Sequence, residues 1–138
     1  MRLILHTALL ATALAALPAV VQAQDRGATD GSAAQSVEVT LSNFKFTPKD
    51  LRLHHGQTYR LHLVNSGSGG HDFSAPEFFA ASEIAPADAA MVRDGRIEVA
   101  KGETRDIRIT PRTPGDYKVE CTHMMHAMLG MKGRITVD

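Results

Sequence analysis

The sequence has little of several features that would each indicate a particular class of protein. Its 138 residues include one cysteine and no tryptophan, and aromatic side chains make up only 5%. Fifteen basic and fifteen acidic residues give a formal net charge of zero, which argues against the basic surface of a nucleic-acid-binding protein. Because one cysteine cannot form an internal disulfide, Cys121 is either a buried thiol or a metal ligand.

Long hydrophobic runs are also scarce. The longest, Leu3–Leu17, is shorter than the roughly 20 residues of a membrane span. Arg2 precedes this run and Ala23 ends a stretch of compact residues, the order typical of a secretory signal peptide over residues 1–23. No cysteine follows for lipid attachment, so we expect a periplasmic protein with no membrane anchor after cleavage.

The rest of the chain divides into two parts. Residues 24–35 are rich in Gly, Ala, Ser and Asp without an apolar period, and we expect a flexible linker. Residues 36–138 are enough for one domain, which we expect to be monomeric.

Short alternating runs of apolar and polar residues recur through residues 36–138. In the first, Ser36–Ser42, valine and leucine fall on one face, and Phe44 and Phe46 continue the alternation. Further runs begin at Leu51, Tyr59, Arg96, Thr104, Tyr117 and Arg134. Seven to eight strands of this kind predict an all-β Greek-key β-sandwich. We expect a short helical insert at Pro76–Ser82, because proline favours the first turn of a helix, and an irregular or weakly helical stretch over residues 83–95.

The segment between the last two predicted strands carries the chemistry. Cys121-Thr-His-Met-Met-His126-Ala-Met-Leu-Gly-Met131 offers a thiolate, two imidazoles and four thioethers within eleven residues. Soft sulfur ligands combined with imidazole select copper, and two histidines, one cysteine and a weak axial methionine make a blue-copper site. The segment supplies the cysteine, one histidine and the methionine, so the second histidine must come from elsewhere.

His71 is the best candidate for that second histidine. It follows the flexible stretch Asn65–Gly70 and would connect a loop in the first half of the chain to the C-terminal segment. We expect His54, His55 and His62 to face solvent or a turn, away from the metal, because each lies off the apolar face of its strand or beside a turn.

The spacing C-x4-H-x4-M, followed by Lys132-Gly133 and a final strand, resembles the cupredoxins, the azurin- and plastocyanin-like small blue copper proteins. The upstream pattern is also similar, in Phe44-x-Phe46-x-Pro48, in Leu51-x-Leu53-x-x-Gly56, and in Asn65 before His71-Asp72-Phe73. The resemblance covers roughly residues 36–138. It implies a cupredoxin-like sandwich and one copper ion with His71, Cys121 and His126 as equatorial ligands and Met131 as the axial ligand.

The resemblance also implies contacts around the metal. Asp72 stands where many members have asparagine, whose backbone amide donates to the cysteine sulfur, and Thr122 can bond back to residue 72. A second departure is Met124-Met125, where many relatives have Pro-Gly. This pair, with His123 and Met128, either forms an apolar rim, which we favour, or binds a second Cu(I).

These features predict a carrier of single electrons, not an enzyme. The alternative is a periplasmic protein that binds copper for tolerance, storage or delivery. An oxidase would need further copper centres, and a binuclear centre of that type needs two cysteines. We expect a redox partner or copper-handling protein to dock briefly near His126, and one tightly bound copper per chain.

Overall fold

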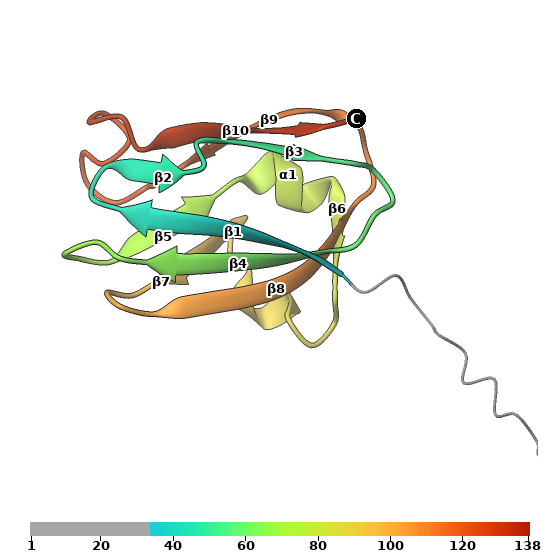
Figure 1. The fold of residues 1–138 in the computed structure, drawn as a ribbon, viewed down its shortest axis with the longest axis horizontal. Helices are drawn as coiled ribbons and strands as arrows, with labels where there is room; N and C mark the ends of the chain where they lie inside the picture. The colour runs from blue at the N-terminus through green and yellow to red at the C-terminus, as the bar shows by residue number, and fades with distance from the viewer. Residues whose placement is uncertain (1–33) are drawn as a thin grey trace, which may run out of the picture.

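The computed structural model describes residues 34–138 and arranges them as two packed β-sheets (Figure 1). The predicted signal peptide, residues 1–23, and residues 24–33 of the predicted linker lie outside the described residues. Among residues 34–138, no helix is both long and apolar enough to cross a bilayer.

Each sheet has five strands. The first runs in the order β2 (Lys45–Thr47), β1 (Gln35–Ser42), β4 (Tyr59–Asn65), β8 (Thr104–Pro111) and β6 (Ser82–Ile84). The second runs β3 (Asp50–Leu53), β10 (Lys132–Val137), β9 (Gly115–Glu120), β5 (His71–Ser74) and β7 (Arg96–Val99). A helix, α1 (Pro76–Ala80), and a single 3-10 turn, η1 (Ala89–Met91), complete the described elements.

The core lies between the sheets, where the alternating apolar residues meet. Leu61 pairs in register with Val37 of β1 on one side and Ile107 of β8 on the other. β1 is parallel to β4 and β3 is parallel to β10. The chain crosses from the first sheet to the second between β2 and β3 and returns to the first at β4. The predicted all-β sandwich with a short helical insert is confirmed.

Three strands differ from the sequence expectation: β2, β5 and β6. The chain turns at Asn43 and Phe44, where Phe44 has a φ of 60°, so Lys45–Thr47 folds back on β1 instead of extending it. β5 was expected as the end of a loop, but all four of its residues are buried. A strand buried on both faces shows no alternation, which is why the pattern missed it. With these three strands, the described residues form ten strands, compared with the seven to eight expected.

Candidate metal centre

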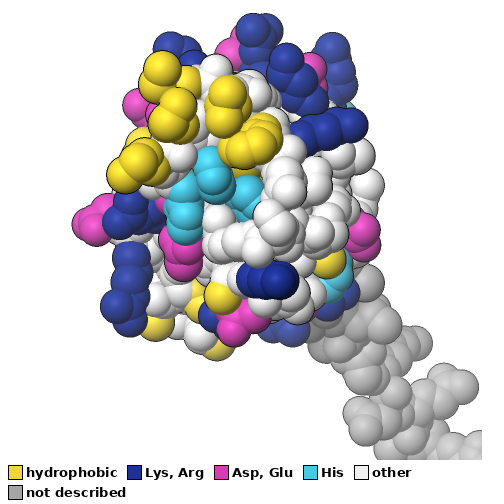
Figure 2. All heavy atoms as spheres, turned by 90° about the vertical axis from the view of Figure 1, so that its left-hand side faces the viewer, with side chains coloured by type: hydrophobic (Ala, Val, Ile, Leu, Met, Phe, Trp, Pro, Cys, Tyr) yellow, Lys and Arg dark blue, Asp and Glu magenta, His cyan; other side chains and the backbone are white. Residues whose placement is uncertain are grey.

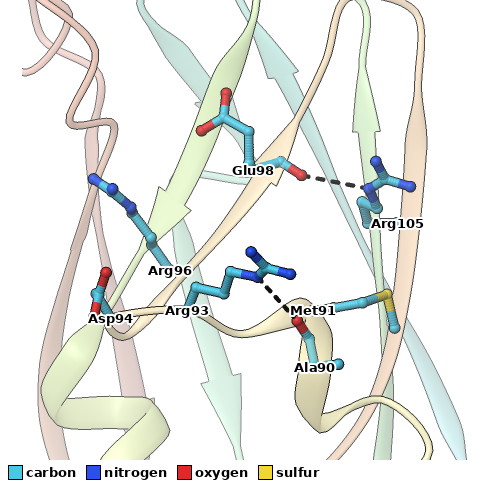
Figure 3. A pocket seen from close by; sticks show the side chains of 7 residues that line it. All are labelled: Ala90, Met91, Arg93, Asp94, Arg96, Glu98 and Arg105. Carbon is cyan, nitrogen blue, oxygen red and sulfur yellow. Dashed lines mark hydrogen bonds between the residues drawn. The ribbon is translucent and has the colours of Figure 1, made fainter.

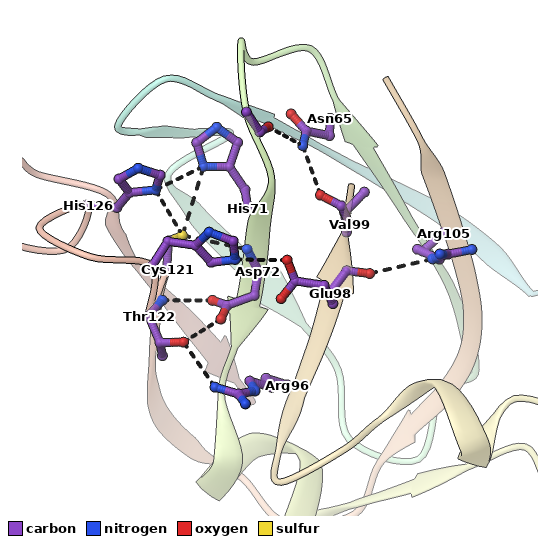
Figure 4. A network of polar contacts seen from close by, with 12 residues as sticks. Asn65, His71, Asp72, Arg96, Glu98, Val99, Arg105, Cys121, Thr122 and His126 are labelled. Atoms are coloured by element: carbon purple, nitrogen blue, oxygen red, sulfur yellow. Dashed lines mark hydrogen bonds and ion pairs between the residues drawn. The ribbon is translucent and has the colours of Figure 1, made fainter. Parts of the chain in front are cut away.

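Three side chains from separate parts of the sequence converge at one end of the sandwich. His71 is the first residue of β5, Cys121 directly follows β9, and His126 lies in the loop that joins β9 to β10, residues 122–130, called here the C-terminal loop. The ring atoms Nδ1 of His71 and Nδ1 of His126 are 3.2 Å apart. Sγ of Cys121 lies 3.8 Å from the first and 3.3 Å from the second (Figure 4).

This triangle has the dimensions of a metal site. A point equidistant from the three atoms lies about 2.0 Å from each, close to the roughly 2.0–2.3 Å at which imidazole nitrogen and thiolate sulfur bind a first-row metal ion. The donor set of two imidazoles and one thiolate, with a methionine nearby, fits a type 1 copper site.

Met131 lies beside these three residues and is fully buried. Its carbonyl accepts the backbone N–H of Cys121 at 3.1 Å, and its own N–H donates to the carbonyl of His126 at 3.0 Å. The backbone of Met131 therefore connects directly to two of the converging residues, and the structure brings all four sequence-predicted residues to one place.

Burial sets the protonation of the converging groups. It raises the pKa of the Cys121 thiol, and the backbone N–H groups of Asp72 and His123 oppose this by donating to the sulfur. Burial also lowers the pKa of His71, and the neighbouring His126 and His123 lower it further. His71 is therefore neutral at neutral pH and offers a lone pair, whereas a metal ion must displace the thiol proton.

A polar network joins the two segments that supply the converging residues. The backbone N–H of Asp72 donates to Sγ of Cys121 at 3.5 Å, as the resemblance implies. The Asp72 carboxylate accepts the N–H of Thr122 at 2.7 Å and also the Thr122 hydroxyl. Arg96 donates to that hydroxyl at 3.2 Å, a contact that the sequence did not indicate (Figure 4).

The loop before His71 is held by a buried asparagine. Asn65 is 2% exposed, donates to the carbonyls of Gly69 and Val99, and accepts the N–H of Gly67. A Cβ at Gly67 would lie 2.4 Å from Nε2 of His71, so only glycine leaves room for the imidazole. That Nε2 is buried without a hydrogen-bond partner among the described residues. Sequence reasoning treated this stretch only as flexible and missed its role in seating His71.

The sequence profile of the cupredoxin-like domain matches residues 7–137. The chain belongs to this family. Among solved structures, a dithionite-reduced auracyanin from Roseiflexus castenholzii is 22% identical with a TM-score of 0.59, covering 78% of this chain and 99% of that chain. Auracyanin B is 24% identical with a TM-score of 0.59, covering 79% and 92%.

A multicopper oxidase from Campylobacter jejuni also shares the fold, at 15% identity and a TM-score of 0.56. The match covers 79% of this cupredoxin but only 31% of the oxidase chain. At these identities the solved structures establish the fold and no more. No curated protein matches significantly.

The surface of this cupredoxin next to the converging residues is apolar. Figure 2 shows hydrophobic side chains adjoining a cluster of histidines on one face. His126 is half-buried, and the ring of Phe44 meets it edge-on with centroids 5.2 Å apart. The large exposed hydrophobic residues of the described chain are Phe44, Met124, Met125, Met128 and Leu129, all in the C-terminal loop or touching it.

His54, His55 and His62 lie away from the centre, as expected. His54 and His55 contact the C-terminal Asp138, and His62 bonds to Asp106 at 2.7 Å across the outer face of the first sheet. His62 is half-buried and not fully exposed, because Asp106 and Arg60 surround it.

A cleft of about 600 Å³ lies beside the centre and is lined in part by Arg93, Arg96 and Arg105 (Figure 3). Its acidic members, Asp94 and Glu98, offset part of that positive charge. Glu98 is hydrogen-bonded to His123, and Arg96 donates to the hydroxyl of Thr122. The cleft therefore shares two residues with the surroundings of the centre.

Proposed function

We propose that this cupredoxin is an exported one-electron carrier, not an enzyme, and that His71, Cys121, His126 and Met131 bind a type 1 copper ion. The observation that carries the proposal is the convergence of two imidazole nitrogens and one thiolate sulfur around a point about 2.0 Å from each. Bound copper supplies a Cu(II)/Cu(I) couple.

The protein's own contribution is to hold these side chains in place. His71 begins a fully buried strand, and the backbones of Cys121 and Met131 are hydrogen-bonded to each other. The hydrogen bond from the N–H of Thr122 to the Asp72 carboxylate also joins the C-terminal loop to β5. Side chains anchored in this way need to move little when the charge of the ion changes, which favours rapid electron transfer.

Partner docking is proposed at the exposed edge of His126. This ring is half-buried, whereas His71 is 1% exposed, so His126 offers the shorter route to the surface. The apolar residues around it suit a brief encounter, because small interfaces allow fast release of a redox partner.

The test is the visible and EPR spectrum of the purified protein loaded with Cu(II). We expect an intense visible band from charge transfer between the Cys121 thiolate and copper, absent in Cys121→Ser. His54→Ala serves as the control, because His54 is 70% exposed and contacts Asp138 far from the centre. A loaded protein with only weak d–d absorption would refute the proposed site.

Export is proposed from residues 1–23 and is tested separately. We expect the mature protein recovered from the periplasm to begin at Gln24, as read by N-terminal sequencing or intact mass. A chain that keeps residues 1–23 in the periplasmic fraction would contradict the proposed cleavage.

Copper tolerance or delivery is the second candidate function, and the exposed methionines of the C-terminal loop favour it. Growth of a deletion strain on copper separates the two candidates. A carrier loses electron flow to its partner at ordinary copper, whereas a tolerance protein shows its defect only when copper is in excess.

A further inference from the structure

The C-terminal loop exposes more thioether than an apolar rim needs. Met124 is 88% exposed, Met128 is 81% exposed and Met125 is 56% exposed. The copper site already has Met131, which is fully buried, so these three side chains take no part in it. Phe44 and Leu129 already supply exposed apolar surface nearby, and they carry no metal-binding atom.

Met125 occupies a backbone conformation that methionine disfavours. Its φ is 64°, in the left-handed region where glycine is free and other residues are strained. Backbone strain of this kind clusters at functional sites, and the group that Met125 presents to solvent is a thioether.

His123 is oriented as a metal ligand. Its Nε2 lies 2.8 Å from Oε1 of Glu98, and a histidine that donates one ring N–H to a carboxylate keeps its lone pair on the other nitrogen, here Nδ1. The His123 side chain is 33% exposed, so an ion from solvent can reach it. Its ring stacks on that of His126 with centroids 5.6 Å apart, next to the copper site.

We propose that His123 and the thioethers of Met124, Met125 and Met128 form a second, solvent-facing site that binds Cu(I). Thioethers and imidazole are soft ligands that select Cu(I) over the hard cations of the periplasm. The ion binds without any change of oxidation state and lies one stacked ring away from His126. The site thus serves as a place where Cu(I) is collected before it reaches the type 1 site.

A competing group of ligands is present but already engaged. Asp72, Glu98 and His123 also bring donor atoms within 4.8 Å of one another. The Asp72 carboxylate is occupied by the N–H and hydroxyl of Thr122, and Glu98 holds the His123 ring. These carboxylates therefore orient the imidazole, and the methionines provide the sulfur donors.

The experiment is an anaerobic competition titration of the purified protein with Cu(I) against a Cu(I) chelator. We expect the wild type to bind one equivalent more than the triple variant Met124→Leu, Met125→Leu, Met128→Leu. Leucine keeps the apolar volume and removes only the sulfur, so the variant separates metal binding from docking. A failure of the type 1 assignment would lower both stoichiometries together and leave the difference of one equivalent intact.

Two further measurements assign the ligands. Ag(I) added to protein that already holds Cu(I) should shift the methyl NMR signals of Met124, Met125 and Met128 and leave Met131 unchanged. Glu98→Gln should weaken binding at the second site by roughly tenfold to a hundredfold, as loss of a carboxylate behind a ligand histidine does. Equal stoichiometry in wild type and triple variant, or unshifted loop methyl signals, would overturn the proposal and leave the loop a docking surface only.

Discussion

The carboxylate of Asp72 and residue Thr122 are joined twice, through the backbone N–H of Thr122 at 2.7 Å and through its hydroxyl. The same aspartate donates its own N–H to the sulfur of Cys121. One side chain that is 1% exposed therefore fixes the strand that begins with His71 to the segment that begins with Cys121.

Replacing Asp72 by asparagine should raise the reduction potential of the bound copper. The substitution removes a buried negative charge near the metal, and that charge stabilises Cu(II) more than Cu(I). We expect an increase on the order of 50–100 mV, since Arg96 offsets part of the charge through Thr122. Protein-film voltammetry measures the change. A lower potential in Asp72→Asn would contradict this electrostatic role.

Met131 and Met128 should respond differently to leucine. Met131→Leu removes the proposed weak axial donor, which would favour Cu(II), so the visible band should remain while the potential rises by roughly tens of millivolts. Met128 is 81% exposed, and Met128→Leu should leave the potential and the band almost unchanged. If Met128→Leu gave the larger spectroscopic effect, the assignment of the axial ligand would be wrong.

Gly67→Ala should disturb copper binding far more than Gly69→Ala. A Cβ at residue 67 would lie 2.4 Å from Nε2 of His71, whereas a Cβ at residue 69 meets nothing within 4 Å. We expect Gly67→Ala to lower the free energy of unfolding by about 1–3 kcal/mol and to weaken copper binding. Denaturant titration and the visible spectrum test both variants. Equal stability and equal copper binding of the two would show that Gly67 does not position His71.

The metal-free protein should lose stability in mild acid. Burial lowers the pKa of His71 below its ordinary 6.5, so between the folded and unfolded pKa values the folded state binds fewer protons. Its contribution to stability is therefore present above pH 6.5 and is lost as the pH falls toward the folded value. The free energy of unfolding in urea should fall more between about pH 7.5 and about pH 5.5 in the wild type than in His71→Gln. The same pH dependence in both proteins would exclude His71 as its source.

Met125→Gly should stabilise the fold. Glycine relieves the left-handed backbone at φ 64°, which costs other residues roughly 1–2 kcal/mol. Thermal unfolding of the metal-free protein should therefore show a higher midpoint. Met124→Gly is the matched control, because Met124 is also exposed, at 88% compared with 56% for Met125, and its φ is not positive, so the midpoint should not rise. A lower midpoint for Met125→Gly would show that the side chain contributes packing that its exposure does not reveal.

The fold class was predictable because most strands have one buried and one exposed face. In β1 and β4, apolar and polar residues alternate in the sequence and buried and exposed residues alternate in the structure, so the period of two can be recognised from the sequence. β5 is buried on both faces and has no such period. The convergence of Cys121 and His126 with His71 was also predictable, because Cys121, His126 and Met131 are close in sequence and their chemistry is distinctive.

Other contacts of the centre could not be read from the sequence. The hydrogen bond from Arg96 to Thr122 joins residues 26 positions apart through the meeting of β7 with the C-terminal loop. The fit of Gly67 against His71 depends on the conformation of a loop, and that conformation cannot be predicted from the amino-acid composition of the loop. Both follow from tertiary packing, and only the folded chain brings these residues together.

The hydrogen bond between Cys121 N–H and Met131 C=O closes the base of the C-terminal loop at the point where β9 and β10 begin to pair. Residues 122–130 therefore begin and end at positions that are fixed by the pairing of β9 with β10. Insertions, deletions or wholesale exchange of residues 122–130 can therefore arise during evolution without disturbing the sandwich. Substitutions confined to this one short segment can therefore change the partner or the metal preference of a related protein while its fold stays the same.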